Sequence, residues 1–384
     1  MAKIGVMGGT FDPIHIGHLA LARAAMTEYG LDRVLFMTGG NPPHKQDRQV
    51  LDGKFRHLMV KAALNGQPGF EPCDYEIKLA DYSYTANTLA HLEKTYPGDE
   101  IYFILGADSL NYVDAWYQPA EIFKRCILLV FGRAGYDAEA DAGRLRGQYG
   151  ADIRLIHGER LAVSSTEIRA LAAAGADISA YVPASVAEII RRYQLYPDPE
   201  EPWTARLRGL LKPRRYRHSL GVRDTAEALA KRFGVDQAQA RTAGLLHDCA
   251  KGLDRSLQIQ MCQELEIPLD RCELENPGLI HAKLGAELVK CWFGIEDPAV
   301  IEAIRWHTLG RPEMDDLAKI IYIADMIEPN RQYPGVEALR QAAFADLNRG
   351  LFACVDATIQ FNLKKGALVH PNGYALRAWI KNQI

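Results

Sequence analysis

Short apolar runs alternate with amphipathic stretches along residues 1–196. Apolar residues on consecutive positions fit strands that are covered on both faces, whereas the stretches between them repeat apolar residues every three to four positions, as helices do. Expected strands cover 3–7, 34–37, 101–105, 127–131 and 153–156, and expected helices include 19–29, 52–65 and 85–96. This alternation predicts an α/β domain with a doubly wound parallel sheet, whose ligands bind beyond the carboxyl ends of the strands.

The pattern changes near residue 197, where the chain reads Tyr196-Pro-Asp-Pro-Glu-Glu-Pro-Trp203. Three prolines and three acids in so short a stretch continue neither a helix nor a central strand, so we expect a linker at 197–203. The remainder, 204–384, reads as a separate all-α domain. Its expected helices include 219–233, 237–251, 281–293, 298–307, 317–327 and 338–364.

Composition fits a folded chain with no general affinity for polyanions. The 384 residues correspond to about two to three domains of ordinary size. Apolar residues make up 48% and charged residues 24%, and the net charge of −3 gives no electrostatic footprint for nucleic acid or a membrane surface. Seven scattered cysteines, without a Cys-x-x-Cys pair, are expected to be reduced thiols in a cytoplasmic protein. The sequence is compatible with a homo-oligomer and leaves the oligomeric state open.

The first expected strand runs directly into Gly-Gly-Thr-Phe-Asp-Pro-Ile-His-Ile-Gly-His, residues 8–18. Gly8 and Gly9 let the backbone pass close to a bulky anion, and the helix that follows turns its free N–H groups toward phosphate. His15 and His18 then face the same spot. A lone His-x-Gly-His would be weak evidence, but its place between a strand and a helix, behind Gly-Gly-Thr-Phe-Asp-Pro, predicts a phosphate site.

These residues resemble the signature of the Rossmann-like nucleotidyltransferase superfamily, and within it the bacterial nicotinate mononucleotide adenylyltransferases, over residues 1–193. The resemblance implies that a phosphate oxygen of nicotinate mononucleotide attacks the α-phosphorus of ATP, supplied with Mg²⁺, and that pyrophosphate leaves. Catalysis of this kind is positioning plus cationic stabilisation of the transition state. His18 and His15 are the residues implied in it.

Two later segments carry the same resemblance. Gly40-Asn-Pro-Pro-His-Lys45 presents Lys45 on an extended loop, and Ser164-Ser-Thr-Glu-Ile-Arg169 reads as a capping box that opens a helix. The resemblance assigns phosphate contacts to Lys45 and Arg169. The residues implied in ATP binding are Gly8, Gly9, Thr10, Phe11, Gly106, Asp108, Ser165, Thr166 and Arg169.

The resemblance implies that Trp116 stacks on the nicotinate ring, that Thr85 lies near the same ring, and that Arg133 contacts the substrate. Taken alone, a tryptophan is more often a core residue than a stacking platform. The family's Arg-Pro-Gly-Tyr element reads Arg133-Ala-Gly-Tyr136 here, without the proline. A pantetheine-phosphate or glycerol-phosphate type transferase is the alternative within the superfamily, and the Pro-Pro-His-Lys and Ser-Thr-Glu-Ile-Arg segments argue against both.

The helical part carries four histidines and two aspartates that each lie on, or at the end of, an expected helix among apolar neighbours. One buried histidine is ordinarily a satisfied core residue, but six such side chains from different helices are hard to explain by packing. A buried carboxylate is costly without a partner, and a metal ion supplies one. Imidazole and carboxylate together suit iron, manganese or zinc. The six residues are His218, His247, Asp248, His281, His307 and Asp325.

This set, with the segments 245–251 and 320–331, resembles the HD-domain phosphohydrolases, and among them the bacterial symmetrical dinucleoside-tetraphosphate hydrolases, over roughly 204–375. The resemblance implies hydrolysis of diadenosine tetraphosphate to two ADP by two metal ions, with iron favoured, that lower the pKa of the attacking water. Asp248 is implied as the catalytic residue that bridges the ions. The implied ligands are His218, His247, Asp248 and Asp325 for one metal, and Asp248, His281 and His307 for the other.

Basic residues near this set leave their roles open. Lys251 and Arg331 are candidates for contact with substrate phosphates, and Lys251 equally fits a surface lysine. The cluster of Lys212, Arg214, Arg215 and Arg217 fits either attraction of an anionic substrate or a solvated helix start. A regulatory nucleotide-binding module and a hydrolase of another nucleotide remain alternatives, although a degenerate module would normally have lost metal ligands.

Overall fold

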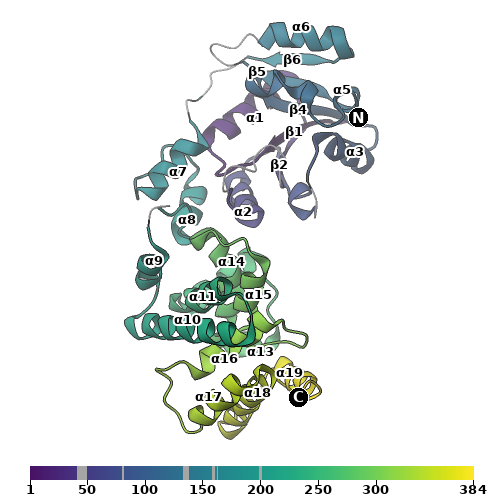
Figure 1. Cartoon of the computed structure of the whole chain (residues 1–384). Coiled ribbons are helices and arrows are strands. Elements are labelled where there is room, and N and C mark those ends of the chain that lie inside the picture. The colour runs from purple at the N-terminus through teal and green to yellow at the C-terminus, as the bar shows by residue number, and fades with distance from the viewer. Residues whose placement is uncertain (41–49, 80–81, 133–137, 158–160, 162, 199–200) are drawn as a thin grey trace. The chain divides into compact units, whose positions relative to one another are not determined.

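The computed structural model divides the chain into two compact units, 1–198 and 199–384 (Figure 1). The residues that it describes are 1–40, 50–79, 82–132, 138–157, 161, 163–198 and 201–384.

The first unit is built on a parallel six-stranded sheet with the strand order β3-β2-β1-β4-β5-β6 (Figure 1). The expected doubly wound α/β arrangement is therefore confirmed. The strands are β1 (Lys3–Gly9), β2 (Arg33–Thr38), β3 (Phe70–Cys73), β4 (Glu100–Gly106), β5 (Ile127–Phe131) and β6 (Ile153–Ile156).

The sequence pattern missed one strand, β3, at the edge of the sheet. Its four residues, Phe-Glu-Pro-Cys, show neither an apolar run nor a regular alternation. Pro72 cannot donate a hydrogen bond to a ladder and is tolerated because β3 pairs only with β2. Pairing with a neighbour, rather than local propensity, thus makes this segment a strand.

Helices and short 3₁₀ turns connect the strands of the first unit. After β1–α1–β2 and the edge strand β3, the chain returns to the other side of β1 to form β4. The carboxyl ends of β1 and β4 therefore flank the point where the strand order reverses, which is where open α/β sheets bind ligands. The helical elements are α1 (Ile16–Tyr29), α2 (Gly53–Leu64), η1 (Glu76–Lys78), α3 (Thr85–Thr95), α4 (Ala107–Leu110), η2 (Val113–Ala115), α5 (Pro119–Arg125), α6 (Ala138–Tyr149), α7 (Ser165–Ala173) and α8 (Ala184–Arg192).

The described residues of the second unit form helices and no strand, as expected. They are α9 (Trp203–Leu210), α10 (Pro213–Phe233), α11 (Gln237–Leu246), η3 (Cys249–Gly252), α12 (Arg255–Glu264), α13 (Arg271–Glu275), η4 (Pro277–Leu279), α14 (Ile280–Phe293), α15 (Pro298–Trp306), α16 (Asp316–Ile327), α17 (Val336–Ala345), α18 (Leu347–Lys364) and α19 (Pro371–Lys381).

Three expected helices of this unit were wrong in their extent. The helix expected at 219–233 begins six residues earlier, at Pro213. The helix expected at 237–251 ends at Leu246, and Cys249–Gly252 forms a separate 3₁₀ turn. The helix expected at 338–364 is two helices, because Asp346 leaves the helical conformation and its side chain accepts a hydrogen bond from the Arg349 N–H. A new N-cap of this kind starts α18 independently of α17.

Close backbone packing brings α10 and α11 together. A Cβ atom at Gly244 would lie 2.9 Å from the Cα of Arg223, so this glycine allows the two helices to approach. Helix α14 lies in the middle of the unit with nearly every side chain buried. Packed in this way, the helices bring His218 of α10 close to Asp248, which follows α11.

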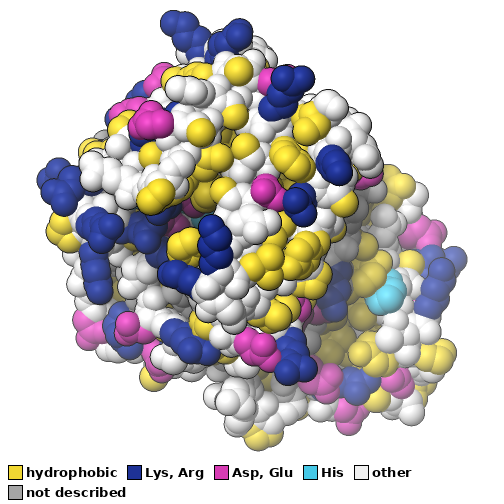
Figure 2. Space-filling view, turned by 90° about the horizontal axis from the view of Figure 1, so that it is seen from below, with side chains coloured by type: hydrophobic (Ala, Val, Ile, Leu, Met, Phe, Trp, Pro, Cys, Tyr) yellow, Lys and Arg dark blue, Asp and Glu magenta, His cyan; other side chains and the backbone are white. Residues whose placement is uncertain are grey.

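The outer helices α17–α19 expose several large apolar side chains among basic residues. Figure 2 shows the molecule from below, with hydrophobic side chains and Lys or Arg side by side on this face. The exposed apolar residues of α17–α19 and their connections are Phe344, Phe361, Leu363, Leu368 and Tyr374.

All seven cysteines lie in described parts of the chain and are free thiols. No helix in the described residues is both long and apolar enough to cross a membrane.

Candidate functional sites

A cleft of about 280 Å³ lies at the strand-order reversal of the first unit. The first turn of α1 supplies His15 and His18 to its wall, the end of β4 supplies Gly106, and the start of α4 supplies Asp108. Ser164, the N-cap of α7, completes the polar part of the lining. Two helix N-termini and two imidazoles therefore converge where the strand ends leave space, an arrangement suited to an anion.

The two histidines stack on each other with ring centroids 3.7 Å apart. The backbone N–H of His15 donates to Nδ1 of His18 over 3.2 Å, so Nε2 of His18 carries the ring proton. Burial and the neighbouring His15 lower the pKa of His18 well below 6.5. His18 is thus a neutral hydrogen-bond donor, whereas the sequence suggested a cationic role.

Gly17 permits this stacking. A Cβ atom at Gly17 would lie 3.0 Å from Nδ1 of His15, too close for the ring to keep its position. The glycine of the His-Ile-Gly-His segment therefore makes room for an imidazole, in addition to opening the helix toward phosphate.

The loop between β1 and α1 is held by residues far away in the sequence. Buried Arg56 donates to the Thr10 carbonyl over 2.6 Å. Arg169 donates to the Asp12 carbonyl over 2.7 Å, and the Tyr196 hydroxyl donates to an oxygen of the Asp12 carboxylate over 2.9 Å. Sequence reasoning named Arg169 but missed Arg56 and Tyr196, because no spacing rule connects them to the loop.

Glycines within and near this loop are also explained by close contacts. A Cβ atom at Gly9 would lie 2.9 Å from the ring of Phe11, and one at Gly106 would lie 2.5 Å from a carboxylate oxygen of Asp108. Gly8 is less crowded, since its nearest neighbour would be the Phe103 ring at 3.4 Å.

The expected capping box at the start of α7 is formed on one side. The Ser164 hydroxyl accepts from the Glu167 N–H over 3.2 Å. Ser165 donates to the Pro13 carbonyl over 3.1 Å, and the Thr166 hydroxyl accepts from Arg169 over 3.3 Å. The hydroxyls of this segment therefore help to hold the loop between β1 and α1 as well as the helix start.

Thr85 and Trp116, two of the residues expected to contact the mononucleotide, belong to other parts of the first unit. Thr85 is the first residue of α3, and half-buried Trp116 packs edge-on against Phe103 with ring centroids 6.4 Å apart. Neither side chain lines the cleft. Lys45 and Arg133 lie outside the described residues.

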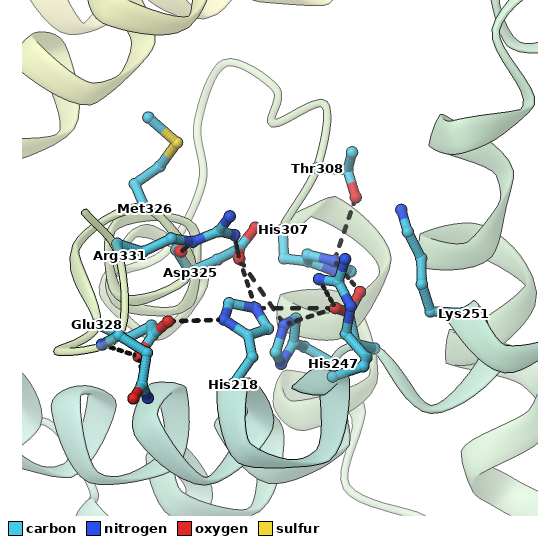
Figure 3. A network of polar contacts seen from close by, with 12 residues as sticks. His218, His247, Lys251, His307, Thr308, Asp325, Met326, Glu328 and Arg331 are labelled. Carbon is cyan, nitrogen blue, oxygen red and sulfur yellow. Dashed lines mark hydrogen bonds and ion pairs between the residues drawn. The ribbon is translucent and has the colours of Figure 1, made fainter. Parts of the chain in front are cut away.

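In the second unit, the six residues expected to bind metal come together. Figure 3 labels four of them, His218, His247, His307 and Asp325. The six come from α10, the end of α11, α14, the end of α15 and α16, and all but half-buried Asp325 are buried. Asp248 lies at the centre. The donor atoms of the three groups that they form lie within 4.8 Å of one another in each group: His218, His247 and Asp248; His247, His307 and Asp325; and Asp248, His281 and His307.

The two oxygens of Asp248 face different histidines. Oδ2 lies 3.8 Å from Nε2 of His218 and 3.5 Å from Nε2 of His247. Oδ1 lies 3.0 Å from Nε2 of His281 and 3.7 Å from Nε2 of His307. A carboxylate with one oxygen toward each pair of imidazoles is the arrangement that lets one side chain bridge two cations.

Asp325 places a second carboxylate near His218 and His247, the two histidines that Oδ2 of Asp248 faces. Its Oδ1 lies 2.9 Å from Nε2 of His218 and 4.0 Å from Nε2 of His247. The Nε2 atoms of His218 and His247 are buried, and neither makes a hydrogen bond within the described residues. Buried polar atoms without such a bond fit a ligand role, because an ion would satisfy them.

The Nδ1 atoms of the four histidines turn away from the cluster toward acceptors. Those of His247, His281 and His307 lie 2.7–2.8 Å from backbone carbonyls three residues earlier in the chain. Nδ1 of His218 instead lies 3.0 Å from the carboxylate of Glu328. Donation from Nδ1 leaves a lone pair on each Nε2, as a metal ligand requires.

Charges in the cluster also favour cation binding. Burial alone would raise the pKa of Asp248, but the neighbouring histidines, His247 first among them, hold it well below its usual value. Burial lowers the pKa of His281 to about 4. Asp248 is therefore ionised and His281 neutral at pH 7, which are the protonation states of metal ligands.

Three cations lie at the edge of the cluster. Arg215 contacts Oδ2 of Asp248 over 2.6 Å, and Arg331 contacts Oδ1 of Asp325 over 2.5 Å. Lys251 donates to the Gly278 carbonyl, which also accepts from His281. Burial lowers the pKa of Lys251. Sequence reasoning left Arg215 within a general basic cluster, and the contact with Asp248 now separates it from the rest.

Asp248 and Lys251 both lie beyond the end of α11, although the helix expected at 237–251 would have carried them. The α-helix ends at Leu246, and Asp248 has φ −101° and ψ 14° before the turn Cys249–Gly252. On a continuous helix, side chains of adjacent residues point about 100° apart. Ending the helix here brings both His247 and Asp248 to one site.

In sequence comparisons, the two units match different protein families. Residues 6–171 match the cytidylyltransferase-like family and residues 215–330 match the HD domain family. A Thermoanaerobacter protein described as a probable nicotinate-nucleotide adenylyltransferase is 39% identical over 203 residues, which are 52% of this chain and 96% of that protein. A Clostridium tetani protein of the same description is 38% identical over 199 residues, 51% of this chain and 100% of its own length.

A structural comparison matches the other half of the chain. A crystal structure described as a predicted HD superfamily hydrolase involved in NAD metabolism from Clostridium acetobutylicum shares 44% identity, with a TM-score of 0.46, and the match covers 47% of this chain and 96% of that one. Together with the six-stranded sheet and the histidine–aspartate cluster, the sequence matches lead to one conclusion. The chain belongs to the nicotinate-nucleotide adenylyltransferase family through its N-terminal half and carries an HD domain in its C-terminal half.

Proposed function

We propose that the chain is a bifunctional enzyme of NAD biosynthesis, acting on nucleotides in the cytoplasm. Its first unit would join ATP and nicotinate mononucleotide into nicotinate adenine dinucleotide and release pyrophosphate. The observation that carries this proposal is the stacked His15–His18 pair at the N-terminus of α1, facing a cleft at the strand-order reversal. Family membership through this half of the chain supports the same reaction.

In this reaction His18 donates Nε2–H to a phosphate oxygen of ATP, while the free N–H groups of α1 face the same phosphates. Arg169, already bound to the loop through the Asp12 carbonyl, adds positive charge. These donors stabilise the charge that spreads over the oxygens around the α-phosphorus as the mononucleotide phosphate attacks. Bond making and breaking take place between the two nucleotides, with no covalent protein intermediate.

The second unit is proposed to be a metal-dependent phosphohydrolase that splits diadenosine tetraphosphate into two ADP. Two cations bound to the cluster, with iron as the preferred ion, would supply an activated water and charge to polarise the phosphorus. Asp248 offers one oxygen to each side, and the four histidines are oriented by their Nδ1 contacts. Arg215, Arg331 and Lys251 hold the polyphosphate chain at the edge of the cluster.

Retention of all six donors, together in one cluster, supports hydrolysis over a purely regulatory nucleotide-binding role. The donor set alone leaves the substrate open, because similar metal clusters cleave many phosphate esters. Hydrolysis of a guanosine nucleotide, or of the dinucleotide made by the first unit, is therefore the competing proposal.

One set of experiments tests both activities on the full-length protein. Elemental analysis gives the metal content, and product analysis follows ATP with nicotinate mononucleotide, diadenosine tetraphosphate, guanosine nucleotides and nicotinate adenine dinucleotide. We expect two metal ions per chain, pyrophosphate from the first pair, and ADP as the sole product from the tetraphosphate. A metal-loaded protein that binds but cleaves none of these nucleotides would indicate a regulatory module.

A further inference from the structure

Glu328 is a buried carboxylate next to the metal cluster, with a side chain 1% exposed. It follows the last residue of α16 and lies three residues after Asp325. One oxygen lies 3.0 Å from Nδ1 of His218 (Figure 3). The other accepts from the backbone N–H and the side-chain amide of Asn330, over 2.7 and 2.9 Å. Within the described residues, no lysine or arginine forms an ion pair with this carboxylate, so its charge is available to His218.

The neighbouring helix is shaped to accept this carboxylate. Gly221 lies one turn after His218 on α10, and a Cβ atom there would lie 2.4 Å from Oε2 of Glu328. Gly221, which has no side chain, therefore leaves space beside His218 on α10. The carboxylates of Asp325 and Glu328, also three residues apart, lie against this part of α10. Two cluster residues and their partner carboxylate thus come from a single interlocked pair of helices.

This environment distinguishes His218 from the other three histidines. Their Nδ1 atoms face backbone carbonyls, and Nδ1 of His281 also lies 3.0 Å from Nζ of Lys251, whereas Nδ1 of His218 faces a carboxylate. A carboxylate partner makes the imidazole a stronger base and fixes its orientation, and loss of such a partner typically weakens metal affinity by about 10- to 100-fold. The extra negative charge also attracts a cation through the ring.

We propose that Glu328 is a positioning residue that makes the two metal positions unequal. The position formed by His218, His247, Asp248 and Asp325 is the tighter one. The position formed by Asp248, His281 and His307 fills second and exchanges more readily. This inference rests on the proposed dinuclear site, and it concerns the order of metal binding rather than the nucleotide that is cleaved.

The test is a Mn²⁺ titration of the metal-stripped, full-length protein, followed by equilibrium dialysis and electron paramagnetic resonance. The wild type should bind two ions in two affinity classes. Glu328→Gln, which keeps the shape and removes the charge, should weaken the tight class by about 10- to 100-fold and leave the weak class in place. Gly221→Ala should have the same effect, because its new Cβ displaces Glu328 from His218.

A matched control is Glu287→Gln, which removes another buried carboxylate of this unit that pairs with Arg305 and Lys290. It should keep both affinity classes. Circular dichroism of the metal-free variants should match the wild type. Unchanged affinities in both Glu328→Gln and Gly221→Ala, or an equal loss at both positions, would overturn the role of Glu328.

The wild-type titration separates this inference from the proposed function. A wild type that binds two ions in two classes but leaves diadenosine tetraphosphate intact refutes the proposed substrate, and the Glu328 test still applies. A wild type that binds no Mn²⁺, or binds two ions with one affinity, refutes the inference directly.

Discussion

The two units use histidine in opposite ways. In the first unit, Nδ1 of His18 accepts a backbone N–H, so Nε2 carries a proton toward the cleft. In the second unit, Nδ1 of His247 faces the Gly244 carbonyl, so Nε2 turns a lone pair toward the cluster. In the two proposed functions, the same ring therefore donates to an anion in one site and binds a cation in the other. On this proposal, the group that faces Nδ1 sets the charge of the partner that each site accepts.

The largest expected effect comes from removing the charge at the centre of the cation site. Asp248→Asn should lose both metal ions and reduce phosphohydrolase activity to below about one thousandth of wild type, because Asp248 is assigned to both ions and they supply several kcal/mol of charge stabilisation. Adenylyl transfer should stay unchanged. Elemental analysis and both activity assays measure this.

The matched control for Asp248 is Asp316→Asn on α16, an exposed carboxylate that pairs only with Lys319 within the described residues. It should retain both ions. Full metal content in Asp248→Asn would remove the bridging assignment.

The next prediction tests His18, the histidine of the first unit that is proposed to donate a hydrogen bond to ATP. His18→Ala should lower kcat for adenylyl transfer by about 10²- to 10³-fold, the usual cost of removing one preorganised donor. His18→Gln should recover part of the rate, because its amide can still donate. Metal content and phosphohydrolase activity should stay at wild-type levels in both variants.

His157→Ala is the control for His18, since this histidine is exposed and pairs with Glu28. A fully active His18→Ala variant would remove His18 from the mechanism. Equal losses in the alanine and glutamine variants would instead indicate that ring packing, rather than donation, is the important property.

A smaller effect is expected at Trp116. Trp116→Ala should raise KM for nicotinate mononucleotide by roughly 5- to 150-fold, equivalent to the 1–3 kcal/mol of a lost base stack, and leave KM for ATP nearly unchanged. Steady-state kinetics with each substrate varied in turn measures the difference. Tyr149→Ala, which removes another half-buried ring from the same apolar core, is the packing control. Equal changes in both KM values would make Trp116 a core residue only.

The smallest effect concerns pH and the neutral state of His18. Because burial lowers the pKa of His18 in the folded protein, the unfolded chain binds more protons below pH 6.5. Stability of the first unit should therefore fall as the pH decreases below 6.5, and this contribution should disappear in His18→Gln. Thermal unfolding of both proteins between pH 5 and 8 tests this. Identical pH dependence would contradict a neutral His18.

The sequence was most informative where the chemistry is local. The loop of residues 8–18 carries both imidazoles and the glycines in one segment, and strands with consecutive apolar residues predicted the sheet around it. The six-residue cluster was also recognised, because apolar helices rarely contain histidine and aspartate without a reason. The catalytic and ligand roles assigned to these residues stay predictions.

Residues that depend on tertiary structure were missed for a physical reason. Arg56 and Tyr196 reach the β1–α1 loop from segments far away in sequence, and periodicity carries no information about such contacts. Glu328 could have been noticed in the sequence. It lies three residues after Asp325, at the end of an apolar helix, where an acidic residue without an assigned role is unusual.

A protein engineer who wished to graft the His247–Asp248 pair onto another helical bundle would need to transfer more than two side chains. Grafted into an uninterrupted helix, one of the two would point away from any shared ligand. The transferable module is the segment 244–252, because Gly244 supplies both the close approach to α10 and the carbonyl for His247, and Cys249–Gly252 redirects the backbone. Libraries that randomise this turn while holding only the His-Asp dipeptide constant would therefore recover few dinuclear sites.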